Sequence, residues 1–389
     1  AFCALASTIA ISAQAQEQAA STPYKYKFSI VKENPATPVK DQASTGTCWC
    51  FATNSFIESE LLRTGKGEHD LSEMFVVRHN YVRRVKDNLL RRGKGNIGPG
   101  SIAHMYIWVM KNVGIMPEEI YDGINYDSKR HNHDELNSWI KSINATAVEM
   151  KKPMPAEILD GVLDAYLGKV PEKFTYQGKE YTVESFTKAM GLNADDYVEI
   201  TSFTHHPFYS QFAIEVPDNW RWDLSYNLPL EDMMAIFDYA IENGYTVAWA
   251  SDVSEAGFNR QGLGIVPDVE GNRQEAGSDE ARWIGKSPEE QNAILNNTNA
   301  PGKELKITQE LRQEGYDNRT TTDDHGMHIY GIAKDQNGGK YYMVKNSWGE
   351  TGKYKGFWYV SEAFVQYKTM NIVVNKNAIP APIRKKMGL

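Results

Sequence analysis

The chain of 389 residues has one cysteine at a position suited to nucleophilic catalysis. Cys48 follows a glycine-containing loop that runs from Gln42 to Thr47, and apolar residues then recur at helical spacing from Phe51 to Leu62. A cysteine in the first turn of a helix gains from the helix dipole and from the free N–H groups there, which stabilise the thiolate. Because the thiolate is the form that attacks a carbonyl carbon, the position predicts that Cys48 is a nucleophile.

A second cysteine, Cys50, lies two residues further along the same predicted helix. The step of two residues turns it about 200° around the helix from Cys48, toward the core. A disulfide between these two positions has poor geometry. The plainer interpretation of a lone helical cysteine is a small buried hydrophobic residue, and we assign that to Cys50.

Two further side chains complete a catalytic set. His325 begins one predicted strand and Asn346 ends the next, and the glycine-rich turn at 337–339 joins the two strands, so the two residues can face each other. The Asn346 oxygen can accept the imidazole N–H and fix the orientation of His325, the expected general base. Trp348 can cover that hydrogen bond from water. His328 is an odd step away on the strand and should face the other way.

An oxyanion-binding pair is also within reach of Cys48. The backbone N–H of Cys48 and the side-chain amide of Gln42, at the far side of the loop, can point at the same developing charge. Asp324 is adjacent to His325, and neighbouring strand residues face apart, so Asp324 is not expected to act as a third catalytic group.

These residues carry a family resemblance. Gln42, Cys48-Trp49, Asp324-His325 and Asn346-Ser347-Trp348-Gly349 resemble, in the same order along the chain, the signature of the papain-like cysteine peptidases. Leu71-Ser72-Glu73 is similar to a further landmark of that family. The resemblance implies a two-lobed papain fold and peptide hydrolysis through a thioester, with peptides as substrates and with no metal or organic cofactor.

The glycine-rich stretch 95–100 is similar to the wall that pairs with an extended substrate in that family. The resemblance therefore implies that Gly98, Gly100 and Trp348 contact the substrate.

Departures from the common pattern point to one branch. The separation of Cys48 and His325 is roughly double the 130–150 residues of the cathepsins, and Thr45 stands where those enzymes have a disulfide cysteine. Both features, with further similar stretches between residues 167 and 258, resemble the bleomycin hydrolase or aminopeptidase C branch. That branch implies an aminopeptidase and, by analogy, a homo-oligomeric ring. The alternatives are an endopeptidase with an open cleft and a catalytically idle papain-fold binding protein.

The pattern of elements favours an α+β fold with two lobes. Helical periodicity covers the first part of the chain, and short strand-like runs dominate after Gly244. We expect a crossing segment (16–45), a helical lobe (46–235) with an insertion at about 126–235, a β-rich lobe (236–374) and a C-terminal arm (375–389). The predicted helices are 48–64, 70–88, 101–113, 156–167 and 230–243, and the predicted strands are 174–183 (a hairpin), 245–251, 325–334, 340–346, 356–360 and 370–374.

The two ends of the chain carry their own signals. Residues 1–12 are apolar and small, and Ala13-Gln14-Ala15 follows, which is typical of a secretory signal peptide. We therefore expect cleavage near Ala15 and export to a periplasm or the extracellular space. At the other end, Pro380 and Pro382 favour an extended arm. The arm resembles those of the bleomycin hydrolases and would place the Leu389 carboxylate beside the α-amino group of a substrate. The alternative is a frayed tail.

Charge and the setting of the histidines argue against binding of nucleic acid, anionic membranes and metal ions. The net charge is −8 and the pI about 5.7, with no basic block, which argues against nucleic acid and anionic membranes as partners. His131 and His133 have the residue type of metal ligands but are expected in a solvated loop. His205-His206 precedes Pro207 and is expected in a loop or at a strand edge.

Overall fold

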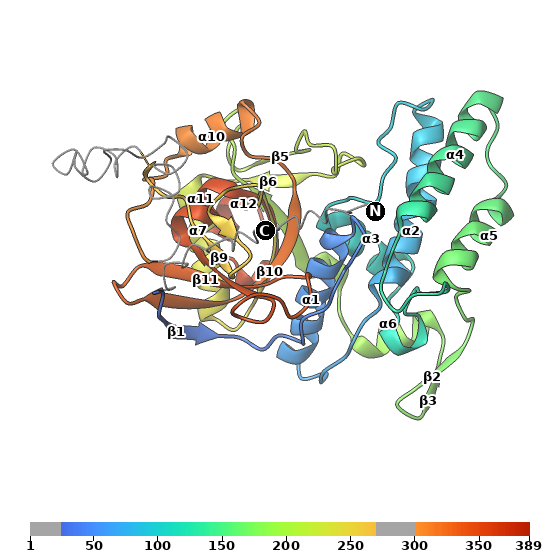
Figure 1. Ribbon diagram of the computed structural model, residues 1–389, viewed down its shortest axis with the longest axis horizontal. Helices are drawn as coiled ribbons and strands as arrows, with labels where there is room; N and C mark the ends of the chain where they lie inside the picture. The colour runs from blue at the N-terminus through green and yellow to red at the C-terminus, as the bar shows by residue number, and fades with distance from the viewer. Residues whose placement is uncertain (1–24, 270–299) are drawn as a thin grey trace, which may run out of the picture.

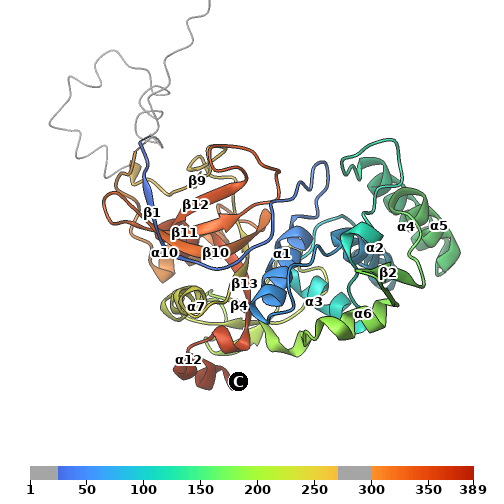
Figure 2. The ribbon, with the colours of Figure 1, turned by 90° about the horizontal axis from the view of Figure 1, so that it is seen from below.

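The computed structural model describes residues 25–269 and 300–389 and has an α+β architecture of two lobes (Figure 1). The predicted signal peptide lies outside the described residues. The first lobe is helical, and the view of Figure 2 separates it from the β-rich lobe. Within the described ranges, no helix has the length and apolar character needed to cross a membrane.

The helical lobe is built around α1, whose residues are buried along almost their whole length. Apolar side chains of α1, α2 and α3 form its core with those of the later helices and a small hairpin. Its elements are α1 (Cys48–Arg63), α2 (Glu73–Leu90), α3 (Ala103–Asn112), η1 (Glu118–Ile120), α4 (Asp134–Met150), α5 (Ala156–Leu167), β2 (Phe174–Tyr176), β3 (Lys179–Tyr181), α6 (Val183–Met190) and η2 (Ala194–Asp196).

The β-rich lobe is one large, mostly antiparallel sheet with helices packed on it. Its strands follow the order β5-β6-β4-β13-β7-β10-β11-β12-β9-β8, and β1 pairs with β10 outside this path. The strands are β1 (Phe28–Glu33), β4 (Tyr197–Thr201), β5 (Ser210–Phe212), β6 (Ser225–Asn227), β7 (Val247–Ser251), β8 (Phe258–Asn259), β9 (Leu263–Gly264), β10 (His325–Asp335), β11 (Lys340–Lys345), β12 (Phe357–Ser361) and β13 (Thr369–Asn375). The helices of this lobe are α7 (Leu230–Glu242), α10 (Gln309–Asp317), α11 (Glu362–Lys368), η4 (Lys376–Ala378) and α12 (Ala381–Met387).

The lobe boundary lies earlier in the chain than residue 235, where the sequence placed it. Strands β4, β5 and β6 all pair within the large sheet. Helix α7 packs its apolar face, which includes Phe237, into the core of the β-rich lobe. The predicted insertion is therefore divided: α4 to α6 belong to the helical lobe, and residues from 197 onward belong to the β-rich lobe.

The C-terminal segment is a helix and not the extended arm expected from its prolines. Pro382 lies in the first turn of α12, where a missing N–H costs no helical hydrogen bond. Ile383 and Met387, four residues apart, share one helix face and are buried in the core of the β-rich lobe. Gly388 ends the helix in a left-handed conformation.

The hydrophobic cores of the two lobes meet at α1. Ala248 of β7 and Val373 of β13 belong to the same apolar cluster as the helices of the first lobe. Helix α1 also packs along β10, which follows from the small size of Gly326. The start of α1 is thereby held against the start of β10.

Candidate active site

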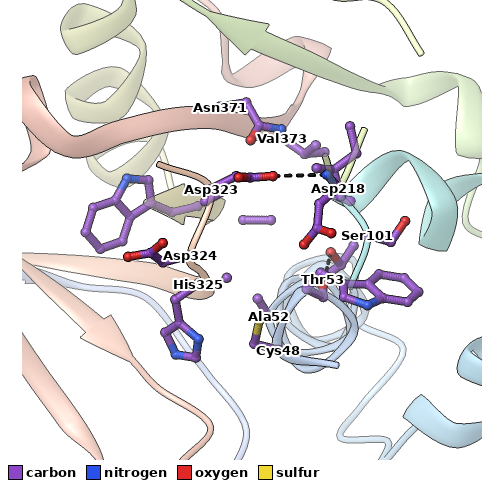
Figure 3. Close-up of a pocket in the computed structure, with 17 residues that line it drawn as sticks. Cys48, Ala52, Thr53, Ser101, Asp218, Asp323, Asp324, His325, Asn371 and Val373 are labelled. Atoms are coloured by element: carbon purple, nitrogen blue, oxygen red, sulfur yellow. Dashed lines mark hydrogen bonds between the residues drawn. The ribbon is translucent and has the colours of Figure 1, made fainter. Parts of the chain in front are cut away.

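Cys48 is the first residue of α1 and lines a cavity between α1 and the start of β10 (Figure 3). The N–H groups of Cys50 and Phe51 are bonded to the Thr47 carbonyl, so the first turn of the helix forms directly after the loop. Both cysteines of the described residues are free thiols. Cys50 is fully buried, and its thiol donates to the Glu73 carbonyl over 3.3 Å, as its predicted core position requires.

Gly326 permits the close approach of the two elements that hold the site. A Cβ atom at this position would lie 3.0 Å from the Trp49 Cα and 3.2 Å from the Cys48 carbonyl oxygen. Both of these neighbours are backbone atoms of α1 and cannot rotate away. The glycine therefore brings Cys48 next to His325, the residue that precedes it on β10.

His325 is held by two residues from the end of β11 and the turn that follows. Its Nε2 donates to the Asn346 Oδ1 over 2.7 Å, and the Ser347 N–H donates to the same oxygen over 2.7 Å. The Trp348 ring stacks on the imidazole with centroids 4.7 Å apart and an interplanar angle of 29°. Because Nε2 carries the proton in this bond, Nδ1 is the nitrogen of the neutral ring that can accept a proton from Cys48.

Burial favours the neutral forms of both catalytic groups. It raises the pKa of the Cys48 thiol to about 11, against the effect of the backbone N–H groups of Gly326, Trp49 and Cys48, which stabilise the thiolate. It also lowers the pKa of His325 to about 4, although the bond to Asn346 acts in the opposite direction. Both shifts favour the neutral thiol and imidazole over the ion pair, so attack involves a proton transfer from Cys48 to His325.

The structure places Gln42 beside the other residues of the set. Its Nε2 donates to the Thr45 carbonyl over 2.8 Å, and its Oε1 accepts a hydrogen bond from the Ser347 hydroxyl over 2.6 Å. The amide is buried and held at both ends, and one of its two N–H bonds remains free of these contacts. Its role at an oxyanion stays a prediction.

The glycine-rich stretch lies beside the first turn of α1. The Trp49 Nε1 donates to the Pro99 carbonyl over 3.0 Å, and Arg84 donates to the carbonyl oxygens of Asn96 and Gly100. Ser101 and Ile102, directly after it, line the cavity. Gly98 lies under the Arg84 side chain, and Gly100 lies under the Asp218 side chain.

Two acidic residues of the cavity were missed by the sequence analysis. Asp218 and Asp323 line it together with Asp324. Asp323 comes two residues before His325, but Asp218 lies between β5 and β6, in a region that carried no catalytic signal. The neighbouring walls are apolar and include Ala248, Ala250 and Val373.

Leu389 lies away from this cavity. The C-terminal helix α12 packs against α7, and Lys386 reaches Asp232 on that helix. Leu389 is absent from the residues that line the cavity with Cys48. The structure thus does not bring the C-terminal carboxylate to the catalytic residues.

His328, His131 and His133 have structural surroundings. His328 is fully buried, and its Nδ1 lies 2.9 Å from the Ser55 hydroxyl of α1, outside the residues that line the cavity. His131 and His133 are also buried, so the solvated loop expected there is wrong. His133 lies immediately before α4 and its Nδ1 is 3.2 Å from the Tyr81 hydroxyl.

His205, His206 and Glu215 form the one group of side chains in the described residues that could hold a metal ion. Both imidazole Nε2 atoms contact the Glu215 carboxylate, at 3.0 and 2.8 Å. The Gln313 amide N–H points at the His205 Nδ1, so that nitrogen accepts and Nε2 carries the proton. The three groups therefore form a hydrogen-bonded cluster as they stand.

Comparisons with known proteins find cysteine peptidases and aminopeptidases. The family model described as papain family cysteine protease matches residues 24–194, and that of the peptidase C1-like family matches residues 303–388. Aminopeptidase C of Streptococcus thermophilus is 20% identical over 390 residues, covering 88% of this chain and 81% of that protein. Cysteine proteinase 1, mitochondrial, of Saccharomyces cerevisiae is 20% identical over 411 residues, covering 92% and 79%.

A solved structure shows the same fold. The crystal structure of PepW from Lactobacillus rhamnosis superimposes with a TM-score of 0.67 at 20% identity, covering 92% of this chain and 84% of that one. The matched models cover the segments that hold Cys48, His325 and Asn346, and the relatives extend the likeness over most of the chain. The chain is thus similar to the papain-like cysteine peptidases, and in particular to their aminopeptidase C and bleomycin hydrolase branch.

Proposed function

We propose that this protein is a cysteine aminopeptidase in which Cys48 is the nucleophile and His325 the general base. The observation that carries this proposal is the 2.7 Å bond from His325 to Asn346, made at the edge of the cavity that Cys48 lines. The aminopeptidases C that this chain resembles support the exopeptidase assignment.

The reaction follows from the geometry. His325 Nδ1 takes the proton of the Cys48 thiol as the sulfur attacks the scissile carbonyl carbon. The oxyanion that forms is stabilised by the N–H of Cys48 and the Gln42 amide. The imidazolium then donates its proton to the leaving amine, and water, deprotonated by His325, hydrolyses the thioester. Asn346 keeps the ring oriented through both steps.

The shape of the cleft favours the removal of residues from a free N-terminus over internal cleavage. The segment between β5 and β6 reaches from the sheet toward the helical lobe (Figure 1), and its Asp218 lies directly on Gly100. An extended substrate that ran along the glycine-rich stretch would meet this segment. A substrate that ends there is not obstructed.

The test is a comparison of one peptide in two forms, with a free and with an acetylated N-terminus. The purified protein should release N-terminal residues from the free form, and Cys48→Ala should be inactive. Efficient internal cleavage of the acetylated form would instead support the endopeptidase. Inactivity on every peptide, with Cys48 still reactive to iodoacetamide, would support the idle binding protein.

We also propose that the protein is exported and that it forms a homo-oligomer. The first proposal is supported by the signal-like sequence ending in Ala13-Gln14-Ala15. N-terminal sequencing of the mature protein should then begin near Gln16. The second is supported by resemblance to the bleomycin hydrolase branch alone, and light scattering of the purified protein should give a mass several times that of the chain.

A further inference from the structure

We propose that the carboxylate of Asp218 binds the free α-ammonium group of the substrate. This inference rests on the proposed aminopeptidase function and adds the side chain that recognises the amine. Asp218 belongs to the loop between β5 and β6, and it lines the same cavity as Cys48 and His325.

The Asp218 side chain is partly buried, at 30% exposure, and its carboxylate has no hydrogen-bond donor among the residues that the structure describes. The nearest cation is the Arg84 Nη2, 3.8 Å from Oδ1, and that guanidinium already donates to the carbonyl oxygens of Asn96 and Gly100. An ammonium ion offers three N–H donors and a compensating charge, and both suit a carboxylate that the protein leaves without donors.

The other two carboxylates of the cavity are already engaged. Asp323 Oδ2 accepts the backbone N–H of Asp218 over 3.0 Å. Asp324 Oδ1 accepts the Thr322 hydroxyl over 2.5 Å, within its own loop. Asp218 is therefore the acidic side chain of the cavity that remains available to a ligand.

Contacts on both sides hold Asp218 in place. The Asn96 side chain donates to the Pro217 carbonyl over 2.8 Å, and the Trp220 Nε1 donates to the Ser101 hydroxyl over 3.1 Å. The two bonds join the β5–β6 loop to the glycine-rich stretch and to the residue that directly follows it. A group fixed on a rigid support in this way binds a ligand without a large ordering cost.

Asp218 also ends the cleft. A Cβ atom placed on Gly100 would overlap both carboxylate oxygens of Asp218, so the side chain lies in contact with the glycine-rich stretch. A substrate chain lying along this stretch must stop at Asp218. The group that a peptide presents where it stops is its α-ammonium.

The charge of the cavity supports the same ligand. Burial and the neighbouring Asp323 carboxylate together raise the pKa of Asp218 to about 7, against the effect of Arg84, which lowers it. A bound cation would stabilise the ionised form and lower this pKa. Asp218 in turn raises the pKa of Cys48, so neutralising its charge favours the thiolate as well.

The test compares two peptides that differ in a single group. One has a free α-amino group and the other has a hydroxyl in its place, which removes the charge with little change in size. The parent enzyme should prefer the amine in kcat/KM by about 10- to 100-fold, the scale of one charge-assisted bond. Asp218→Asn should reduce that preference to about 2-fold or less by slowing the amine substrate and not the hydroxy one.

Glu215→Gln is the matched control. Glu215 lies three residues earlier in the same loop, but its carboxylate contacts His205 and His206 outside the cavity. This variant should keep the full preference for the amine. Asp218→Ala should in addition make an N-acetylated peptide a better substrate, because it removes the side chain that ends the cleft. Melting temperatures and alkylation of Cys48 by iodoacetamide verify that each variant is folded with an accessible site.

A pH dependence measured on the parent enzyme tests the inference without any variant that must fold. Protonation of Asp218 should abolish the preference, so the ratio of amine to hydroxy kcat/KM should fall as the pH drops through about 7. The charged or titratable groups that interact with Asp218 are Asp323 before β10, Arg84 on α2 and Cys48 on α1, and Asp324 and His325 line the same cavity. Arg84 stays charged throughout this range.

The outcomes distinguish a failure of this inference from a failure of the proposed function. A parent enzyme with equal kcat/KM for the amine and hydroxy peptides contradicts both. A parent that prefers the amine, with an unchanged preference in Asp218→Asn and a ratio constant between pH 5.5 and 7.5, contradicts the assignment to Asp218 alone. Selective cleavage of acetylated peptides with a lysine near the scissile bond, lost in Asp218→Asn, would make the carboxylate a side-chain pocket and overturn the inference.

Discussion

The Trp348 ring stacks on the face of the His325 imidazole, with centroids 4.7 Å apart, while the Nε2 of the same ring bonds to Asn346. The indole excludes water from a bond that fixes which nitrogen carries the proton. It also contributes to the burial that lowers the pKa of His325 to about 4.

Trp348→Ala should therefore move the pH dependence of Cys48 reactivity. Once water reaches the imidazole, the imidazolium is better stabilised, and the His325 pKa rises toward its ordinary value of about 6.5. His325 stops acting as a base when the pH falls below its pKa, which lies near 4 in the parent. In the variant this should happen at a higher pH. The rate at which iodoacetamide alkylates Cys48, followed against pH, measures the change. An unchanged profile would show that the stacked ring has no part in setting this pKa.

The two cysteines should respond differently to substitution. Cys48→Ala removes the nucleophile and should abolish peptide hydrolysis. Cys50→Ala removes a buried thiol that bonds to the Glu73 carbonyl, so it should lower stability by about 1–3 kcal/mol and keep most of the turnover. Kinetics and chemical denaturation of both proteins decide this, and a folded but inactive Cys50→Ala would overturn the assignment.

Gln42→Ala should lower kcat by about 10²-fold, the usual effect of losing one oxyanion donor. The Ser347→Ala variant is a useful comparison, because the Ser347 hydroxyl donates to the Gln42 Oε1 and supports the amide without being an oxyanion donor itself. Ser347→Ala should lower kcat much less than Gln42→Ala, since it removes one support of the amide and leaves the amide in place. Equal losses in the two variants would indicate that Gln42 acts through the loop structure alone.

Gly326→Ala should damage both stability and turnover. The new methyl group would meet backbone atoms of α1 at 3.0–3.2 Å, and the start of the helix would have to move away from β10. We expect a loss of about 1–3 kcal/mol in the free energy of unfolding and a larger fall in kcat than in substrate affinity. Gly338→Ala is the control, because a Cβ there meets no atom within 4 Å and only its positive φ opposes it. Full activity of Gly326→Ala would show that the site tolerates a wider separation.

Deletion of residues 381–389 should destabilise the β-rich lobe and should not release cleavage of N-blocked peptides. It exposes the surface that Ile383 and Met387 cover, at about 1.5–3 kcal/mol for each side chain. Lys385→Ala, on the exposed face of the same helix, should leave the melting temperature unchanged. A stable truncated enzyme that cleaves acetylated peptides would restore the gating arm expected from the sequence.

Much of the arrangement of Cys48, His325 and Asn346 could be predicted because its signals are local. The helix after Cys48 has clear apolar periodicity, and β10 and β11 are adjacent in the chain and joined by a tight turn. Cys48 and His325 are far apart in sequence, and only their types and order suggested that they meet. Their pairing depends on the close packing at Gly326, which a lone glycine in a strand does not reveal.

The errors have equally specific causes. Strands β5 and β6 are three residues each, too short for an alternating pattern, so the lobe boundary was placed too late and Asp218 was left without a role. The segment 381–387 was interpreted from its prolines, although Ile383 and Met387 have the spacing of a helix face. Tertiary burial of that face determined the structure there.

Ala248 and Val373, strand residues that lie within the apolar cluster of the helical lobe, have a consequence for how the molecule unfolds. Because the two cores are joined through them and through α1, neither lobe can melt without exposing apolar surface of the other. Heating should therefore give a single calorimetric transition, with the calorimetric and van't Hoff enthalpies in agreement. Denaturant should abolish Cys48 reactivity and the circular dichroism of both lobes at the same midpoint. An enzyme whose catalytic groups come from two lobes would in this way lose its site all at once and pass through no partly folded, active form.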